Sequence, residues 1–487
     1  MKPTILFDES QCANGKTTRL NKKAANDLQI AGKSTLIIKP SIKAIKDSLE
    51  DFKTLGVPAA SCVGVYGSED KTDESPLLGD ILTVLDRDDP TILLITRVSF
   101  KNLASSNPRL YKNWSLVMDE VVDVYEHNCE VFVANKEEAI SVVEKMFDKT
   151  SVESFYKITA KPNISDNDAF NKLFGGIVKK AKSDFFDTYM HYCDGDNGFV
   201  INFHSVLNTK IISCFDNSFL YASHGETSLQ HHIWSHTATF KVMGGREFKP
   251  HEGKVEIHCP NMNSFSKSFD ENNKKVKNDF IDIFYNHVGC SKTFIYLDNN
   301  KTNFTHPLPE NKVPHNTAGQ NCFQDKDTVG LFSSLNPRSY ESNFISQMYG
   351  ISQPKQVQIR HADTFYQTIM RGILRLSENH GKTMHVYCMS RQVAKWLGEY
   401  FTECTIIEHD VYSPVKKEKI KKEKLSPENR NKAYMIKKVH NIGKVKTKDL
   451  MNTKLWNACS CRGLIQKPYS GDDVQTLLAT TGDINNA

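Results

Sequence analysis

A Gly-Lys-Thr tripeptide near the N-terminus constrains this 487-residue chain more than any other feature. The apolar residues 4–7 predict a short buried strand and residues 17–27 predict a helix, so Gly15, Lys16 and Thr17 lie where the two elements join. Strand, loop and helix in this order form a cradle for the phosphates of a nucleotide. The N–H groups of the loop and the positive end of the helix supply donors that need no rearrangement.

The loop departs from the usual pattern at two glycine positions. Ser10 stands where the pattern G-x-x-x-x-G-K-[ST] requires glycine, and Ala13 stands where many related loops have another. We expect both residues to follow the loop only if they avoid positive φ. Lys16 would contact the β- and γ-phosphates, and the Thr17 hydroxyl would bind Mg²⁺. The predicted nucleotide-binding residues are Ser10, Ala13, Asn14, Gly15, Lys16, Thr17 and Thr18. The alternative is an ordinary strand-to-helix turn with an incidental lysine.

The composition is that of an ordinary globular protein. A chain of 487 residues exceeds a single core, so we expect two large units and a tail. No apolar run approaches the roughly 18 residues that span a bilayer, so no membrane partner is expected. The N-terminus leads straight into the first strand, which argues against a leader segment. The 12 cysteines lack zinc-type pairing and are interpreted as the reduced thiols of a cytoplasmic protein.

The net charge of +5 is unevenly distributed along the chain. Residues 411–450 carry 13 Lys and Arg against four Asp and Glu, which leaves −4 for the remainder. A basic segment attached to a near-neutral body predicts either a polyanionic partner or a solvated tail.

Strands with polar ends recur through the first part of the chain. Residues 33–41, 89–97 and 113–122 contain continuous apolar runs, and helical segments separate them. This pattern predicts a parallel sheet covered on both faces. Ligands gather at the carboxyl ends of the strands of such a sheet. The polar residues at these ends are Asp8, Ser41, Thr96, Arg97, Asp119 and Glu120.

Asp119 and Glu120 supply the two carboxylates that hydrolysis of a nucleoside triphosphate requires. We assign Asp119 to Mg²⁺ and Glu120 to the attacking water. A solvated acidic turn after a strand is the alternative. The nucleotide loop about 100 residues upstream favours the catalytic interpretation.

The second part of the chain contains two further candidate segments. Residues 233–240 predict an apolar strand that ends in small hydroxyl residues. Residues 365–375 predict a helix with Gln367, Arg371 and Arg375 at positions i, i+4 and i+8, on one face.

In this order the segments resemble those of a superfamily 2 helicase of the DEAD/DEAH-like type over residues 4–400, with compact motifs as in phage-encoded members. The nucleotide loop resembles motif I, Pro40-Ser41 motif Ia, Thr96-Arg97 the next nucleic-acid motif, and Met118-Asp119-Glu120 motif II. Thr237-Ala238-Thr239 resembles motif III, residues 293–297 motif IV, Gly319-Gln-Asn321 motif V, and residues 367–375 motif VI.

Two of these motifs depart from the family pattern. In motif VI, Met370 replaces a glycine and Arg375 comes one residue late, which on a helix turns its side chain by about 100°. In motif V, Asn321 replaces an aspartate. The role of arginine finger is therefore expected first of Arg371.

The resemblance implies an α/β fold of two tandem RecA-like parallel-sheet lobes. The first lobe would span residues 1–243, with an insertion at about 129–232, and the second would span residues 244–410. Residues 411–487 would form a basic C-terminal tail or a small accessory module.

The activity implied is ATP hydrolysis that depends on nucleic acid, by a helicase or translocase in viral genome replication, recombination or repair. ATP and Mg²⁺ would bind between the lobes, where Glu120, Gln367, Arg371 and Arg375 act in catalysis. The coupling residues would be Thr237, Ala238, Thr239, Gly319 and Asn321. The nucleic-acid contacts would be Pro40, Ser41, Lys43, Thr96, Arg97, Asn299, His315 and Asn316.

The expected partner is nucleic acid, with DNA favoured over RNA, and the tail is expected to reach replication or recombination proteins. The expected location is the cytoplasm, that of the host if a phage encodes the chain. Three alternatives stay open. They are a viral genome-packaging motor, a translocase that does not unwind duplex, and a non-catalytic nucleic-acid-binding protein. A packaging motor would need nuclease carboxylates, of which Asp298 alone is a candidate.

Overall fold

The structure is a computed structural model that describes residues 2–67, 75–133, 136–162, 169–195, 198–223, 225–288, 293–296, 312–313, 322–379 and 381–412. Three sheets organise these residues, two of them parallel and one antiparallel. Within the described residues, no helix combines the length and the apolar character needed to cross a bilayer.

The first sheet is parallel throughout, with the strand order β12-β1-β11-β5-β2-β4-β3. Its strands are β1 (Thr4–Asp8), β2 (Ser34–Lys39), β3 (Cys62–Val65), β4 (Ile92–Thr96), β5 (Tyr111–Asp119), β11 (Phe215–Tyr221) and β12 (Thr239–Val242). The helices that follow them are α1 (Lys16–Ala31), α2 (Ile42–Thr54), α3 (Ser75–Leu85), α4 (Arg97–Ser105) and α7 (Leu229–Trp234).

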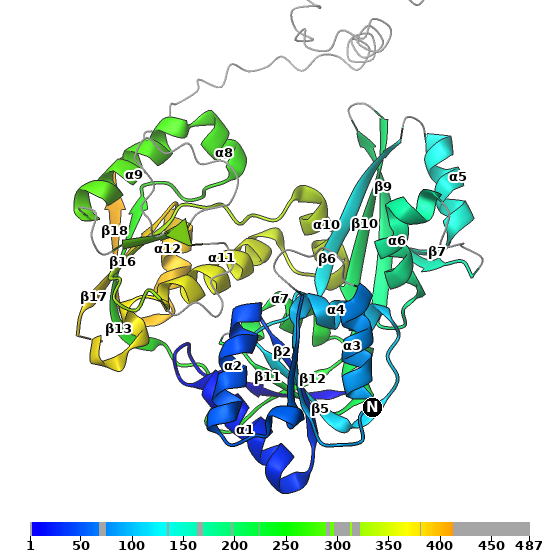
Figure 1. Ribbon diagram of the computed structural model, residues 1–487. Coiled ribbons are helices and arrows are strands. Elements are labelled where there is room, and N and C mark those ends of the chain that lie inside the picture. Colours follow the sequence, from blue (N-terminus) through cyan, green and yellow to red (C-terminus); the bar gives the residue numbers. More distant parts are fainter. Residues whose placement is uncertain are drawn as a thin grey trace, which may run out of the picture. The chain divides into compact units, whose positions relative to one another are not determined.

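Continuous apolar strands in this sheet bury both faces. On β2, Leu36 and Ile38 pack with α3 and α4 in one core cluster, whereas Ile37 packs with α1 and α2 in another. Because side chains alternate along a strand, the two clusters are the two faces of one sheet. Figure 1 shows these helices distributed over the sheet.

The second sheet is antiparallel and has the strand order β6-β10-β9-β8-β7. Its strands are β6 (Tyr125–Val133), β7 (Phe147–Val152), β8 (Phe155–Ala160), β9 (Phe186–Gly195) and β10 (Gly198–Leu207). Helices α5 (Lys136–Met146) and α6 (Ala169–Lys182) share a core with it. This sheet interrupts the first one in the chain, but over a shorter range than the insertion predicted at about 129–232, because β11 already belongs to the first sheet.

The third sheet is again parallel, with the strand order β15-β14-β16-β17-β13-β18. Its strands are β13 (His251–Pro260), β14 (Thr293–Tyr296), β15 (Lys312–Val313), β16 (Thr328–Leu331), β17 (Thr383–Cys388) and β18 (Phe401–His409). The helices of this part of the chain are α8 (Lys267–Asn272), α9 (Lys274–Val288), α10 (Ser339–Tyr349), α11 (Gln353–Ile369) and α12 (Arg391–Gly398). Two tandem parallel sheets confirm the predicted α/β class with RecA-like lobes.

One helix from the second half of the chain completes the core of the first half. Phe344 and Ile345 of α10 are buried in the same cluster as Tyr125 and Phe155 of the antiparallel sheet. The Phe344 ring stacks on His204 with ring centres 4.3 Å apart. Large aromatic surfaces packed in this way contribute strongly to a core.

Two sequence-based predictions of elements are wrong. Residues 233–240 do not form a strand, because α7 runs to Trp234 and β12 begins only at Thr239. The helix predicted over residues 365–375 ends at Ile369, and a 3-10 turn follows at Ile373–Arg375. Some apolar side chains of the two segments lie on a short helix and on a turn, instead of on the predicted strand and helix. The spacing of apolar residues in the sequence therefore predicted the wrong elements.

Candidate nucleotide site

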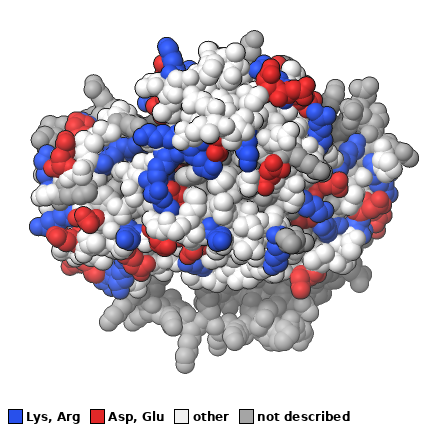
Figure 2. Space-filling view, turned by 90° about the horizontal axis from the view of Figure 1, so that it is seen from below, with Lys and Arg blue, Asp and Glu red and all other residues white. Residues whose placement is uncertain are grey.

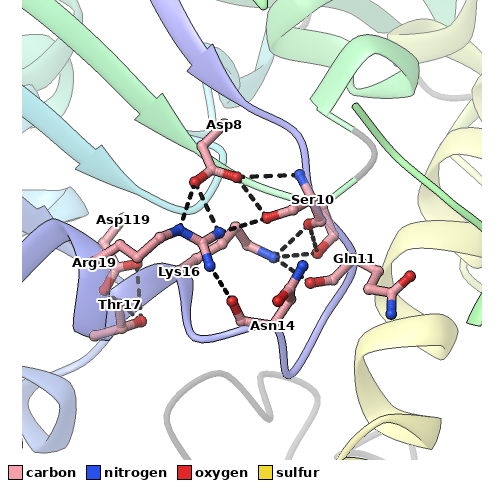
Figure 3. Close-up of polar contacts among 9 residues, drawn as sticks. Asp8, Ser10, Gln11, Asn14, Lys16, Thr17, Arg19 and Asp119 are labelled. Carbon is pink, nitrogen blue, oxygen red and sulfur yellow. Dashed lines mark hydrogen bonds and ion pairs between the residues drawn. The ribbon is translucent and has the colours of Figure 1, made fainter. Parts of the chain in front are cut away.

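Hydrogen bonds from Arg19 hold the loop between β1 and α1 in place of the missing glycines. The Arg19 guanidinium donates to Asp8 Oδ2 at 2.8 Å and to Ser10 Oγ at 2.7 Å, and also to the Asn14 carbonyl. Ser10 Oγ in turn donates to Asp8 Oδ1 at 2.5 Å. Figure 3 shows Asp8, Ser10, Asn14 and Arg19 as one connected group.

Asp8 is the buried anchor of this group. Burial alone would raise the pKa of its carboxyl, but the hydrogen bonds from Ser10 and Arg19 outweigh burial and lower it. An ionised Asp8 therefore stays paired with Arg19, which is the geometry that stiffens the loop. Ser10 thus has a use here that glycine could not supply.

Ala13 takes a conformation that the sequence analysis excluded. Its φ is +64°, close to the +66° of Gly15, whereas Ser10 has no positive φ. The expectation that Ala13 avoids this region is therefore wrong. A Cβ there costs about 1–2 kcal/mol, which the hydrogen bonds of Arg19 to the loop offset.

Lys16 points back into the loop that precedes it. Its Nζ donates to the carbonyls of Ser10 at 2.7 Å and Gln11 at 2.9 Å, and to Ser223 Oγ at 2.5 Å. The side chain is buried, with the residue 8% exposed. Oxygen ligands around the ammonium in a closed loop mark the position that phosphate oxygens take in a nucleotide cradle.

Asp119 lies at the end of β5 between two partners. Thr17 Oγ1 is 3.3 Å and 3.4 Å from its two carboxylate oxygens. Lys39, the last residue of β2 and fully buried, donates to Asp119 Oδ2 at 2.8 Å. Thr17 and Asp119, both predicted to bind Mg²⁺, are thus neighbours, and Lys39 would share the Asp119 carboxylate with a metal ion.

Glu120 has an unusual backbone and an unusual carboxyl. Its φ is +90°, and its N–H donates to the Tyr221 carbonyl at 3.0 Å. Burial raises the pKa of its carboxyl above the usual 4.5, and the positive charges of Lys16, Arg97 and Arg371 oppose that rise. A carboxyl with a raised pKa in a cavity has the properties of a general base.

The three residues predicted in the second part of the chain, Gln367, Arg371 and Arg375, lie near Glu120, but they do not lie on one helix as expected. Gln367 lies on α11, and its Nε2 donates to Glu120 Oε2 at 3.3 Å. Arg371 follows the end of this helix and Arg375 lies in the 3-10 turn, so the three do not share one helical face. Burial, with the adjacent charge of Arg371, lowers the pKa of Arg375.

A cavity of about 570 Å³ collects these groups, a size typical of small-molecule sites. Its lining comes from the nucleotide loop, from α2, from the end of β5, and from α11 with the turn after it. The predicted site residues on its wall are Ala13, Gly15, Lys16, Thr17, Thr18, Pro40, Asp119, Glu120, Gln367, Arg371 and Arg375. Side chains from the part of the chain that forms the first parallel sheet and from the part that forms the other parallel sheet therefore line the same cavity.

Of the predicted coupling residues, the three that the structure describes, Thr237, Ala238 and Thr239, do not line this cavity. Thr239 pairs with Thr4 at the start of β1, so Thr237, Ala238 and Thr239 lie at the other end of the strand from Asp8. Strand β11 ends beside the nucleotide loop, and Ser223 just after it contacts Lys16. Gly319 and Asn321 lie outside the described residues.

The predicted nucleic-acid contacts lie in several different environments. Ser41 and Thr96 cap helices, since their hydroxyls accept from Ala44 N and Ser99 N at 3.2 Å each. Lys43 is exposed, whereas Arg97 is partly buried and acts on the Glu120 carboxyl. Pro40 lines the cavity. Asn299, His315 and Asn316 lie outside the described residues.

Basic surface is not confined to the predicted tail. On the face drawn in Figure 2, Lys and Arg side chains gather in a band, and acidic side chains are scattered around it. The body of the chain therefore offers positive charge of its own, although its formal charge was expected to be near neutral.

Sequence reasoning missed three residues of this site, Arg19, Lys39 and Ser223, and it named Asp8 only as a polar residue at the end of a strand. Lys39 was hidden within an apolar strand, and Arg19 within the first turn of a helix. A signal existed for Arg19, because it follows Lys16 by three residues and so faces the loop from the same side of the helix. Ser223 required knowledge of which strand lies next to β1.

No family model matches the chain, and no curated protein matches it. Among solved structures, Saccharomyces cerevisiae Dbp5 bound to RNA and ADP BeF3 is 11% identical, with a TM-score of 0.34 and coverage of 84% of this chain and 86% of that one. T4 UvsW is 8% identical, with a TM-score of 0.23 and coverage of 84% and 74%. The yeast DEAD-box splicing factor Prp28 is 12% identical, with a TM-score of 0.23 and coverage of 80% and 73%. At these identities and TM-scores the likeness by itself establishes neither a shared fold nor a shared activity.

Proposed function

We propose that this chain is a nucleic-acid-dependent ATPase of the helicase or translocase type. The observation that supports it most is the cavity of about 570 Å³ lined by Lys16, Asp119, Glu120 and Arg371. Phosphoryl transfer needs a phosphate cradle, carboxylates for a metal ion and for water, and a cation opposite them. These are the residue types that the cavity presents.

The residues present fit ATP and Mg²⁺. Lys16 has three oxygen partners that phosphate oxygens can replace. Asp119 and Thr17 supply the oxygen ligands that Mg²⁺ prefers. When bound, ATP supplies the phosphoryl group and Mg²⁺ neutralises part of its charge.

The chain's own residues then divide the work. Glu120 orients the attacking water and accepts its proton, and Gln367 holds the Glu120 carboxylate. Arg371, with Arg375 beside it, stabilises charge on the transferring phosphoryl group, a contribution of about 10³–10⁵ in rate. Hydrolysis would depend on how closely Arg371 and Arg375 approach the bound phosphates, which couples the reaction to closure of the two lobes.

The track and the biological role are also proposals. We propose DNA rather than RNA as the partner, and a role in genome replication, recombination or repair. The basic segment of residues 411–450 supports a polyanionic partner of either kind.

The deciding experiment measures ATP hydrolysis with no nucleic acid, single-stranded DNA, duplex DNA and RNA, together with strand displacement. Lys16→Ala should abolish hydrolysis that nucleic acid stimulates, while Lys22→Ala, an exposed residue of the same helix, should retain it. Stimulated hydrolysis by Lys16→Ala would show that the nucleotide site is elsewhere. Hydrolysis without strand displacement would indicate a translocase that does not unwind.

A further inference from the structure

A second cluster of ionisable side chains lies on the third sheet. Glu256 and His258 are two residues apart on β13 and therefore share a face. His385 on β17 pairs in register with Glu256, which brings its side chain to the same face. The ligand atoms of these three residues all lie within 4.8 Å of one another. None of the three lines the nucleotide cavity.

His258 provides an independent indication of a ligand. The residue is 5% exposed, and its Nε2 has no hydrogen-bond partner within the described part of the chain. A buried polar atom left without a partner is destabilising and therefore rare. The other ring nitrogen, Nδ1, lies 3.1 Å from His409 Nε2. When Nδ1 donates to His409, the lone pair of His258 is on Nε2.

Other side chains that could bind a metal ion surround the Nε2 lone pair of His258. His385 Nδ1 lies 3.3 Å from Glu256 Oε2, and it too has no hydrogen bond within the described residues. The ring of His287, near the end of α9, is centred 4.7 Å from that of His385 and 5.5 Å from that of His258. Glu256 and His385 have side chains 31% and 23% exposed, which leaves a route from solvent to the buried His258.

We propose that Glu256, His258 and His385 bind a divalent transition-metal ion, Zn²⁺ in preference to Mg²⁺, with His287 as the fourth ligand. Imidazole nitrogens with one carboxylate suit Zn²⁺, whereas Mg²⁺ prefers oxygen ligands. Tetrahedral bonds of about 2.0–2.2 Å place ligand atoms roughly 3.4 Å apart, so the side chains would draw together on binding. The ion would join strands β13 and β17 to helix α9, and Figure 1 labels all three in the same part of the molecule.

His409 is a positioning residue in this arrangement. It lies on β18 beside β13 and holds His258 Nδ1. Groups that fix the tautomer of a metal ligand change metal affinity by about 10–100-fold when removed. His409→Leu should therefore weaken Zn²⁺ binding by about that factor without abolishing it.

The test uses the full chain, freed of metal with a chelator and titrated with Zn²⁺ against a chromophoric competitor. Wild type should bind one equivalent more than His258→Gln or His385→Gln, and His236→Gln, an exposed histidine, should match wild type. Any Zn²⁺ that binds to cysteines would bind equally to wild type and to all of the variants. The difference in Zn²⁺ stoichiometry between them therefore measures binding at the histidine cluster. With Co²⁺ in place of Zn²⁺, the lost equivalent should carry the visible bands of tetrahedral nitrogen and oxygen ligation without a thiolate charge-transfer band.

Equal stoichiometry and affinity in wild type and folded His258→Gln would overturn the site, as would the absence of Zn²⁺ binding by wild type. If His258→Gln fails to fold by circular dichroism, the partly exposed His385 supplies the comparison. The melting temperature gives a second readout: Zn²⁺ should raise that of wild type and His236→Gln but not that of His385→Gln.

Discussion

Glu9 opens the nucleotide loop with only 6% of its surface exposed. Burial raises the pKa of its carboxyl from 4.5 to about 7. The folded state therefore favours the protonated form. Its stabilising contribution is complete below pH 4.5 and is lost as the pH rises to about 7.

Glu9→Gln should consequently raise the free energy of unfolding at pH 8 by roughly 2–3 kcal/mol, because glutamine keeps the neutral form. At pH 4.5 the substitution should change little. Chemical denaturation at the two pH values measures this difference. Glu50→Gln, at an exposed position, is the control. A gain that does not depend on pH would mean that the pKa of the Glu9 carboxyl is the same in the folded and unfolded states.

Lys39 is the second residue with an environment that can be tested, since it is fully buried and pairs with Asp119 at 2.8 Å. Lys39→Met leaves the Asp119 charge without its partner, which typically costs 3–5 kcal/mol. Mg²⁺ can replace the missing charge if Asp119 is a metal ligand. We therefore expect Mg²⁺ to raise the melting temperature of Lys39→Met more than that of wild type.

Lys33→Met, at an exposed position before the same strand, is the matched control and should respond to Mg²⁺ as wild type does. The same Mg²⁺ response in Lys39→Met and wild type would argue against Asp119 as the metal ligand. The melting temperature of each variant does not depend on catalytic activity.

Among the elements, the turn after α11 decides where the two arginines lie. Gly372 separates the end of the helix from the 3-10 turn, and a Cβ on it would meet the Lys326 carbonyl at 2.8 Å and Met384 Cε at 2.8 Å. The close approach allows Ile373 N–H to bond the Lys326 carbonyl at 2.8 Å. The glycine therefore fixes the turn by its lack of a side chain.

Gly372→Ala should displace this turn, at a cost of about 1–3 kcal/mol in stability, and should lower ATP hydrolysis about tenfold or more by moving Arg371 and Arg375. Gly381→Ala is the control, because no atom lies within 4 Å of its Cβ position. Steady-state hydrolysis and denaturation measure both effects. If the Gly372→Ala protein is destabilised but hydrolyses ATP at the normal rate, the position of this turn does not determine the rate of hydrolysis.

At this scale the sequence predicted the strands with continuous apolar runs and missed those without them. Strands β1, β2, β4 and β5 were found because each contains a continuous run of apolar residues. Strand β11 was missed because Asp216, Asn217 and Ser218 interrupt its apolar residues, although it lies inside the sheet between β1 and β5. The strand predicted at residues 233–240 was instead a short helix and a turn. Local periodicity does not report neighbours in a sheet, and tertiary packing overrides it.

The same limit explains which parts of the site were predicted. The residues set by a local motif, Lys16, Thr17, Asp119 and Glu120, line the cavity as expected. Arg371 and Arg375 also line it, though on a turn instead of a helix. Ser223 could not be found, because its contact with Lys16 spans 207 positions of the chain.

In the molecule as a whole, α10 links its two halves. The fully buried Phe344 contacts Tyr125, Phe155 and His204, with ring centres at 5.6, 5.1 and 4.3 Å. Phe344→Ala should lower the free energy of unfolding by about 3–5 kcal/mol, because it leaves a cavity in a shared core. Asn343→Ala, one residue earlier and exposed, should have little effect.

The shape of the transition is the sharper measurement. Because α10 belongs to the core of the antiparallel sheet, wild type should unfold in one cooperative step when followed by probes in either half. Phe344→Ala should separate the probes. Two separate transitions already present in wild type would show that α10 does not couple the halves.

The position of α10 also affects the order in which the chain folds during synthesis. Domains normally fold as they leave the ribosome, N-terminal first. Here the core around Tyr125 and Phe155 stays open until Phe344 emerges, about 200 residues after β6 and β8 have been made. A fragment that stops at residue 243 would leave this aromatic surface bare and prone to aggregate. We therefore expect residues 1–243 to aggregate when they are expressed without α10.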